Sequence, residues 1–388
     1  MVLPYGFNNA VIVLLMPYLL RKYGMTVGQI STITAVAYIP LIWSFLWSPV
    51  ADTGLRRQYW AIVSAVTCAV TAAAAILFVH SSVPVLMTLL FVSSGCSGLL
   101  SSACGALLTM IPESMRGRAS GWYQAGNVGG NAIAGGGLIW LADHASLQTI
   151  AMIVLVLLIA PSLAALWLQE AAPIRGAIGP KILAMLHDLR DLLRSRRTWL
   201  GLAFFLSPVG TAAVNNLISG LGPDYHASGN EVAVVTGLAS GLLSMLGCFA
   251  GGLFADRMNR MMAYALSGGL TAAFGAWLAF GALSPFTFGA GYAGYSLAAG
   301  FAYAVYTALL LDVVGKRQHA AALAYSALNA SGNASIAYMT WLDGVGYKHW
   351  GIRGLMGTDM AANAVFAVLL VLVALFAGHH WHHRREAA

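Results

Sequence analysis

The segment SPVADTGLRR at residues 48–57 has a second copy in the same chain, GLFADRMNR at residues 252–260. Each copy follows a long apolar run and places an Ala-Asp pair shortly before an arginine. Asp52 and Asp256 lie 204 positions apart in a chain of 388 residues, so the two copies occupy equivalent places in its two halves. The sequence therefore contains an internal repeat of about half its length.

Two further groups of residues repeat in the same order. The pair Asn8-Asn9 returns as Asn215-Asn216, 207 positions later. A stripe of polar and small residues returns at an offset of 202, with Tyr123, Asn127, Gly130 and Asn131 matched by Tyr325, Asn329, Gly332 and Asn333. Three matches in one order predict two structurally similar halves.

The composition excludes a soluble protein. Hydrophobic residues make up 59% of the chain and charged residues only 9%, whereas a soluble domain has about 25% charged residues. The four cysteines lie in apolar stretches without C-x-x-C spacing, so we expect no metal, redox centre or cofactor. The first apolar stretch has no basic leader or small-residue cleavage site, so no cleavable signal peptide is predicted.

Apolar runs broken by polar or turn residues predict twelve transmembrane helices. They cover residues 3–20, 27–50, 59–79, 84–111, 120–142, 147–168, 199–221, 232–254, 262–283, 286–311, 320–342 and 361–378. Sixteen of the twenty Lys and Arg residues fall in the loops, linker and tail of one side. This excess identifies the cytoplasmic side, and it makes both termini cytoplasmic. The basic residues thus explain the net charge of +7 without a nucleic-acid partner.

The only long polar stretch, residues 169–198, divides the chain. Apolar residues recur in it at helical spacing among Lys and Arg, which predicts an amphipathic helix on the cytoplasmic membrane surface. It separates a six-helix bundle at 1–168 from a second bundle at 199–388, which ends in a short tail. We therefore expect an all-α integral membrane protein with twelve transmembrane helices in two six-helix bundles, related by an axis along the membrane normal.

Both Asp-containing loops resemble the G-x-L-A-D-R-x-G-R-R signature of the major facilitator superfamily. The first copy departs from it at Ser48, Thr53 and Leu55, and the second at Asn259. The resemblance implies a monomeric secondary transporter that works by alternating access and is not an enzyme. Its expected partners are a small-molecule cargo, membrane lipid and, if transport is coupled, protons.

The N-terminal region has a narrower resemblance. LPYGF at 3–7, LLRKYG at 19–24 and FLWSP at 45–49 are similar to the AmpG-type permeases. That group carries muropeptides into the bacterial cytoplasm, and related branches carry siderophores or acetyl-CoA. The resemblance implies an importer in a bacterial inner membrane, with a drug or metabolite exporter as the alternative. In that group several apolar residues precede the first motif, whereas only two do here, which leaves open a longer native N-terminus.

The resemblance also implies a gate. In the family, the loop Asp contacts the start of a helix in the opposite half, which would be the eleventh span for Asp52 and the fifth for Asp256. A carboxylate suits a helix N-terminus, where the macrodipole is positive. We expect Asp52 with Arg56, and Asp256 with Arg260, to act in gating. The alternative is a solvated loop residue that only sets topology.

Polar residues inside the spans are the candidates for binding cargo. Tyr123, Asn127 and Asn131 recur at i, i+4 and i+8, so they share one helix face. Buried amides need partners, which either a polar, largely neutral cargo or a neighbouring helix could supply. The candidate cavity residues are Asn8, Asn9, Tyr123, Asn127, Asn131, Asn215, Asn216, Tyr303, Tyr306, Tyr325, Asn329 and Asn333.

Carboxylates are scarce within the predicted spans. Asp343 and Asp359 fall near the predicted outer ends, so the candidates for proton coupling are Glu113 and Asp312, at the cytoplasmic ends of two spans. An intramembrane protease is the rival class, because Gly95–Gly98 matches G-x-S-G. No histidine is predicted within a span to activate its serine. A channel would need rings of charge or carbonyl filters, which the pattern lacks.

Overall fold

A computed structural model describes residues 1–25, 27–80, 82–168, 205–315 and 321–386, with the isolated positions 187, 190, 194 and 199. The chain forms two compact units. The first contains Met1–Ile111, Gly126–Gly201 and Val313–Ala330, and the second contains Pro112–Ala125, Leu202–Asp312 and Ser331–Ala388. The units follow the two halves of the sequence, except that 112–125 and 313–330 each belong with the opposite half. The predicted boundaries at 168 and 199 stay a prediction, and the predicted linker helix falls largely outside the described residues.

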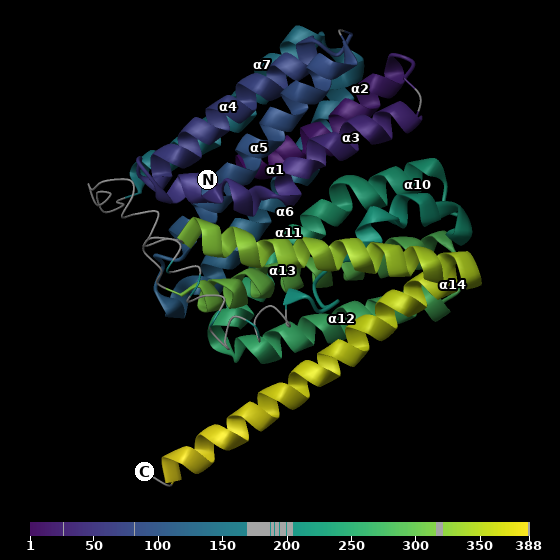
Figure 1. The fold of residues 1–388 in the computed structure, drawn as a ribbon. Helices are drawn as coiled ribbons and strands as arrows, with labels where there is room; N and C mark the ends of the chain where they lie inside the picture. Colours follow the sequence, from purple (N-terminus) through teal and green to yellow (C-terminus); the bar gives the residue numbers. More distant parts are fainter. Residues whose placement is uncertain are drawn as a thin grey trace. The chain divides into compact units, whose positions relative to one another are not determined.

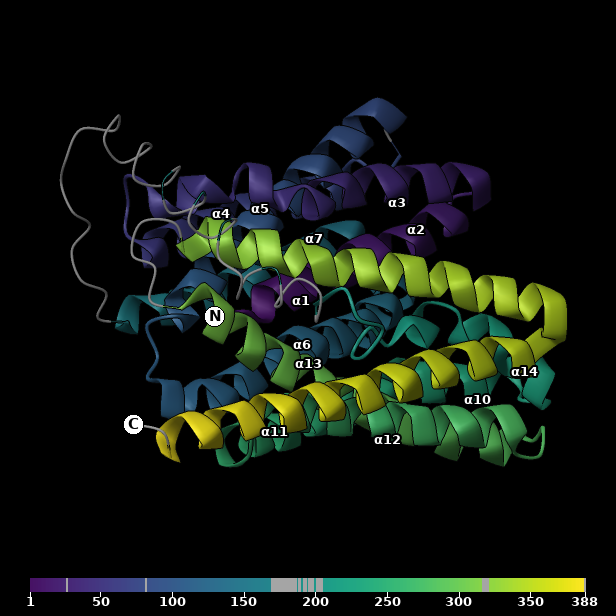
Figure 2. The same cartoon turned by 60° about the horizontal axis from the view of Figure 1, so that its bottom comes forward.

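The helices of the first unit pack around an apolar core. They are α1 (Leu3–Ala10), which continues through a π-helical turn into α2 (Met16–Lys22), then α3 (Val27–Ile42), α4 (Arg57–Leu77), α5 (Val83–Leu108), the later part of α6 (Arg116–His144), and α7 (Leu147–Ser162). Figures 1 and 2 show α4 beside α5 and α7. Small residues on α4, such as Ala69 and Ala72, are fully buried and let these helices approach closely.

The second unit contains two short 3-10 segments (Ala213–Asn216 and Ile218–Tyr225), then α10 (Gly229–Val234), α11 (Ser240–Arg257), α12 (Arg260–Phe280), α13 (Tyr292–Val314) and most of α14 (Ala321–Glu386). The starts of two helices, α10 and α12, follow from the local sequence. Ser228 and Glu231 form a capping box at α10, and the Asn259 side chain caps α12 by accepting from the N–H groups of Met261 and Met262. The signature departure at Asn259 is therefore a helix cap.

Eight described helices are long and apolar enough to cross a membrane. They account for the predicted spans 1, 3, 4, 6, 8, 9 and 10, and one of them, Ala321–Leu375, covers spans 11 and 12 together. Span 2 is present as the shorter α3, and span 5 as α6. The predicted span 7, residues 199–221, falls partly outside the described residues, and its described part is short 3-10 helix.

Helix α14 doubles back on itself. Its helical geometry is broken only at Trp350 and Gly351, where Gly351 has a φ of 60°. Figures 1 and 2 both show the two arms meeting at this tip. The helix therefore continues past the predicted end of span 11 at residue 342 and reaches the predicted start of span 12 at residue 361 as the second arm.

Candidate functional site

Asp52 binds the start of α14. It lies at the end of a 3-10 turn, Ser48–Asp52, and its side chain is completely buried. One carboxylate oxygen accepts hydrogen bonds from the backbone N–H groups of Ala322 (2.9 Å) and Leu323 (3.3 Å), and the other is 3.0 Å from a guanidinium nitrogen of Arg57. Burial raises the pKa of Asp52 to about 6, against the opposing effects of Arg57 and the two N–H donors.

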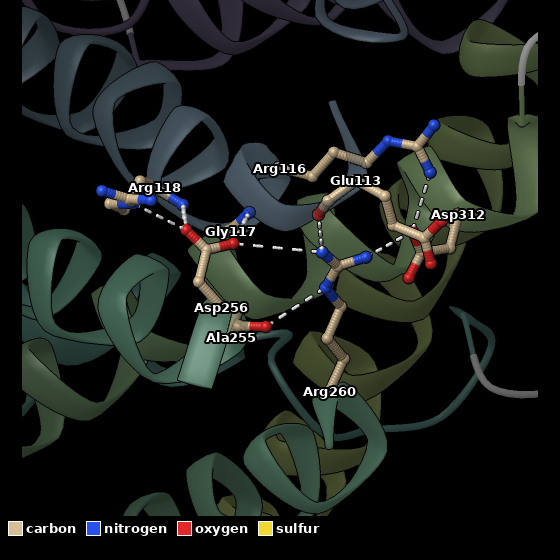
Figure 3. A network of polar contacts seen from close by, with 8 residues as sticks. All are labelled: Glu113, Arg116, Gly117, Arg118, Ala255, Asp256, Arg260 and Asp312. Carbon is tan, nitrogen blue, oxygen red and sulfur yellow. Dashed lines mark hydrogen bonds and ion pairs between the residues drawn. The ribbon is translucent and has the colours of Figure 1, made fainter. Parts of the chain in front are cut away.

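Asp256 makes the equivalent contact with the start of α6, as Figure 3 shows. Its carboxylate accepts from the backbone N–H groups of Gly117 (2.7 Å) and Arg118 (2.9 Å) and from Arg118 Nε (3.0 Å). These N–H groups belong to the first helical turn, which has no intrahelical partners for them. A carboxylate there satisfies two donors and faces the positive end of the helix dipole.

An arginine cluster extends the second contact (Figure 3). Arg260 donates to the carbonyl oxygens of Ala255 (3.2 Å) and Glu113 (2.5 Å) and pairs with Asp312. Arg116 also pairs with Asp312, at 2.9 Å, and its side chain is only 5% exposed. Arg260 therefore ties the end of α11, the start of α12, the segment before α6 and the end of α13 into one network.

Glycines allow the backbones to meet beside Asp256. A Cβ atom added at Gly117 would lie 2.5 Å from the carbonyl oxygen of Gly252, and one added at Gly121 would lie 2.7 Å from that of Cys248. No side chain fits at these distances, so α6 and α11 are in direct backbone contact. Such contacts between small residues hold helices together in lipid without large side chains to interlock.

The structure places three of the predicted gating residues in these two contacts and adds Arg57 to the first. Asp52 and Asp256 contact the starts of the predicted eleventh and fifth spans, and Arg260 lies in the second network. Arg57, in the first turn of α4, is the ion-pair partner of Asp52, whereas Arg56 is the residue that precedes the helix. The two arginines are adjacent in the sequence, so only the position of the helix start separates their roles. Glu113 takes part through its backbone, and Asp312 lies in ion pairs. Their role in proton coupling stays a prediction.

Two cavity candidates on α1, Asn8 and Asn9, have partners on neighbouring helices, and the candidates on α6 and α14 differ in burial. Asn8 is buried and accepts from Ser93 Oγ (2.9 Å), while its Nδ2 has no partner. Asn9 accepts from the Tyr38 hydroxyl (2.9 Å). On α6, Tyr123 is buried in the second unit, and Asn127 and Asn131 are half-buried in the first; the Asn131 side-chain oxygen is unpartnered. On α14, Tyr325 is buried against Gly105 and Asn329 is half-buried.

The candidates of the second unit gather partly around one amide. Asn215 accepts from the Tyr292 hydroxyl (2.9 Å) and interacts with Tyr303. Asn216 donates to Thr340 (3.0 Å). Tyr306 packs edge-on against Phe205, and Asn333 is exposed. Tyr292 was not among the predicted residues, although its place three turns before Tyr303 on α13 could have suggested it.

Comparisons with known proteins agree on the fold. The sequence model of the Major Facilitator Superfamily matches residues 1–339. No curated protein sequence matches the chain significantly. Among solved structures, the human organic anion transporter MFSD10 (TETRAN) has a TM-score of 0.70 and 14% identity, with 95% of this chain and 96% of that chain covered.

Two sugar transporters are similar to the same degree. FucP, a fucose:proton symporter of E. coli, has in its outward conformation a TM-score of 0.71 and 15% identity, with 96% of this chain and 97% of that chain covered. The proton:xylose symporter XylE, bound to 6-bromo-6-deoxy-D-glucose, has a TM-score of 0.68 and 14% identity, with coverage of 96% and 92%. At these identities the likeness concerns the fold, an integral multi-pass arrangement of helices.

Proposed function

This chain belongs to the Major Facilitator Superfamily, and we propose that it moves a polar, largely neutral small solute across a membrane by alternating access. The observation that carries this proposal is the pair of matched contacts at Asp52 and Asp256. Each joins a loop after one helix to the start of a helix from the opposite half of the sequence.

The chemistry of these contacts suits a reversible latch. Each consists of a few hydrogen bonds to the free N–H groups of a helix start, and water can replace such partners when the helix moves away. Beside Asp256, the glycine contacts leave few interlocked side chains to separate. Breaking the latch would open the end of the bundle that carries the basic loops, which we propose faces the cytoplasm.

The residues proposed to bind cargo are amides and phenols. Asn215, with Tyr292 and Tyr303, and Asn9, with Tyr38, offer neutral hydrogen-bond donors and acceptors. Such groups fit hydroxyl- and amide-rich solutes. The resemblance at residues 3–49 to AmpG-type permeases supports import of muropeptide-like or siderophore-like cargo through a bacterial inner membrane. A metabolite or drug exporter of the same superfamily is the second candidate.

Uptake by the purified protein in liposomes tests this function. Muropeptides, siderophores, acetyl-CoA and monosaccharides are offered in turn, with the doubly substituted Asp52→Asn, Asp256→Asn protein as the control. We expect saturable uptake of one polar class and slower uptake by the control at unchanged cargo affinity. Equal uptake into protein-free liposomes for every solute would reject import, and efflux from preloaded liposomes would then favour the exporter.

The proposed cavity has its own test. Asn127→Ala and Asn329→Ala each remove one amide, which should weaken cargo affinity about two- to tenfold, the loss of a hydrogen bond of about 0.5–1.5 kcal/mol. Thermal stability should change little. A fall in stability with unchanged affinity would instead make these residues helix-to-helix contacts.

A further inference from the structure

Two aspartates lie at matching positions on the two arms of α14. Asp343 is eight residues before Gly351, at the tip, and Asp359 is eight residues after it. At 1.5 Å per residue, both lie about 12 Å from the tip. Two antiparallel arms that meet at one turn bring such equidistant positions to the same level.

Glycines between the aspartates and the tip bring the arms together. A Cβ atom added at Gly346 would lie 2.7 Å from the Gly354 carbonyl oxygen, and one added at Gly354 would lie 2.2 Å from that of Gly346. The arms therefore touch through their backbones one turn from the aspartates. This contact places Asp343 and Asp359 close enough to interact electrostatically.

The two carboxylates are buried without partners. Asp343 and Asp359 have no exposed surface, and none of their four side-chain oxygens has a hydrogen-bond partner among the described residues. Two more buried oxygens next to them are also unsatisfied. One is Oδ1 of Asn363, one turn after Asp359, and the other is the hydroxyl of Tyr295 on α13. Tyr295 is fully buried, packs in one core with Ile352 and Met356 of α14, and interacts with both carboxylates.

The charges around the pair give it no compensation. Tyr295 is the titratable side chain that faces it from α13. The basic residues nearest in sequence, Lys348 and Arg353, are exposed at the tip, and neither forms an ion pair with Asp343 or Asp359 in the described residues. Two adjacent buried carboxylates without a cation cannot both stay ionised, because desolvation and mutual repulsion disfavour the doubly charged state.

We propose that Asp343 and Asp359 form a proton-binding site within the arms of α14. A proton taken from water adds to one carboxylate oxygen, and the resulting O–H donates to the other carboxylate. The Tyr295 hydroxyl then donates a hydrogen bond to the carboxylate that keeps the negative charge. This assigns proton binding to a place other than Glu113 and Asp312, and it gives three of the four unsatisfied oxygens of the aspartates a role.

The site also adjoins the proposed cargo residues. Tyr295 interacts with Tyr303, which in turn interacts with Asn215. The three side chains lie in the second unit and link the carboxylate pair to the amide that accepts from Tyr292. A change in the charge of the pair would therefore alter the electrostatic environment of Asn215 through Tyr295 and Tyr303.

Infrared difference spectra of the purified protein in nanodiscs, taken between about pH 6 and about pH 10, test the proposal. The wild type should lose the C=O band of a protonated carboxyl as the pH rises, on the order of one proton per chain. The double variant Asp343→Asn, Asp359→Asn should lack this change, when every protein compared also carries Asp52→Asn to remove the carboxyl that titrates near pH 6. Asp224→Asn, which removes an exposed carboxylate bonded to Tyr347, should keep it. No cargo is needed, so the result is independent of the proposed transport function.

Three outcomes would overturn the proposal. The first is a wild-type spectrum without the band, and the second is a band that persists in the double variant. The third is a wild-type band that disappears saturably when Na⁺ replaces choline as the cation of the buffer, which would make the site a sodium site. If the double variant does not fold, Asp359→Asn alone decides. Removing one charge leaves Asp343 without its repelling neighbour, so its band must shift in pH; an unshifted band refutes the shared site.

Discussion

Asp256→Asn should release the start of α6 from α11. Asp256 accepts three hydrogen bonds, two from backbone N–H groups and one from Arg118. Asparagine keeps one acceptor oxygen for Gly117 but turns an NH₂ group towards Arg118, whose nitrogens cannot accept. The variant therefore loses two charge-assisted bonds, worth about 1.5–3 kcal/mol each when buried.

The net cost is smaller than this sum. The Arg118 side chain is 52% exposed, so water screens and replaces part of its interaction. We expect about 2–3 kcal/mol in the equilibrium between the contact and its separated state. That corresponds to a shift of about 30- to 150-fold towards separation.

A native thiol reports this separation. Cys248 has no exposed surface, and its backbone oxygen is in contact with Gly121 of α6. With Cys68, Cys96 and Cys104 replaced by serine, the labelling rate of Cys248 by a water-soluble maleimide measures how often α6 leaves α11. The rate should rise with the shift in equilibrium, about 30-fold or more in Asp256→Asn.

The matched control is Asp224→Asn, a carboxylate of the same unit that accepts its hydrogen bonds from Tyr347 among the described residues. It should label at the wild-type rate. A change of less than about threefold in Asp256→Asn would place the contribution of the carboxylate below about 1 kcal/mol. The latch would then consist of the glycine contacts alone, and the gating role of Asp256 would fail.

The remaining predictions concern the first contact and the packing of the second unit. The pKa of Asp52 is raised to about 6 in the contact, so protonation of Asp52 favours the contact. Hydrogen-exchange protection of the start of α14, corrected for intrinsic exchange, should therefore fall as the pH rises through about 6. Asp52→Asn should remove this pH dependence. Arg57→Gln should lower the same protection about fivefold, whereas Arg56→Gln should leave it unchanged, and equal effects would reject the assigned pairing. Gly300→Ala places a Cβ 1.8 Å from a carbonyl oxygen of α11 and should cost about 1–3 kcal/mol of stability, while Gly269→Ala, with open space around its Cβ, should be tolerated in the same melting assay.

The two Asp contacts could be predicted because both loops resemble the major facilitator signature, and in that family the loop Asp contacts a helix start in the opposite half. An Ala-Asp pair at the end of a span and a helix start in the other half recur at nearly one offset, so either copy supports the other. The repeat did not distinguish Arg56 from Arg57. That choice depends on whether α4 starts one residue earlier, and in the structure Arg56 has an extended backbone (ψ 146°) while Arg57 begins the helix.

The hydropathy pattern missed the carboxylate pair for a physical reason. The apolar signal between residues 343 and 360 is diluted by Asp343, Lys348, Arg353 and Asp359. The pattern therefore predicts that span 11 ends at residue 342 and span 12 begins at residue 361, which leaves both aspartates outside the spans. The helix continues because the charged groups differ in position: Lys348 and Arg353 reach water at the tip, while the aspartates are covered by the opposite arm and α13. A window-based average cannot separate these cases. The spacing of both aspartates from Gly351 carries the information instead.

The acidic side chains of the second unit thus fall into two groups, and the difference assigns them different parts in a transport cycle. Asp256 and Asp312 are surrounded by Arg116, Arg118, Arg260 and the N–H groups of α6. Their charge is compensated in place, so moving α6 changes which partners they have without requiring a proton. Asp343 and Asp359 have no such partners among the described residues, so the charge of the pair can change only by binding or releasing a cation. The Asp256 contact keeps its charge and can therefore respond to helix movement. The Asp343–Asp359 pair changes its charge and can therefore drive helix movement. If both contribute, Asp256→Asn should leave the proton band intact, and the Asp343→Asn, Asp359→Asn protein should still protect Cys248.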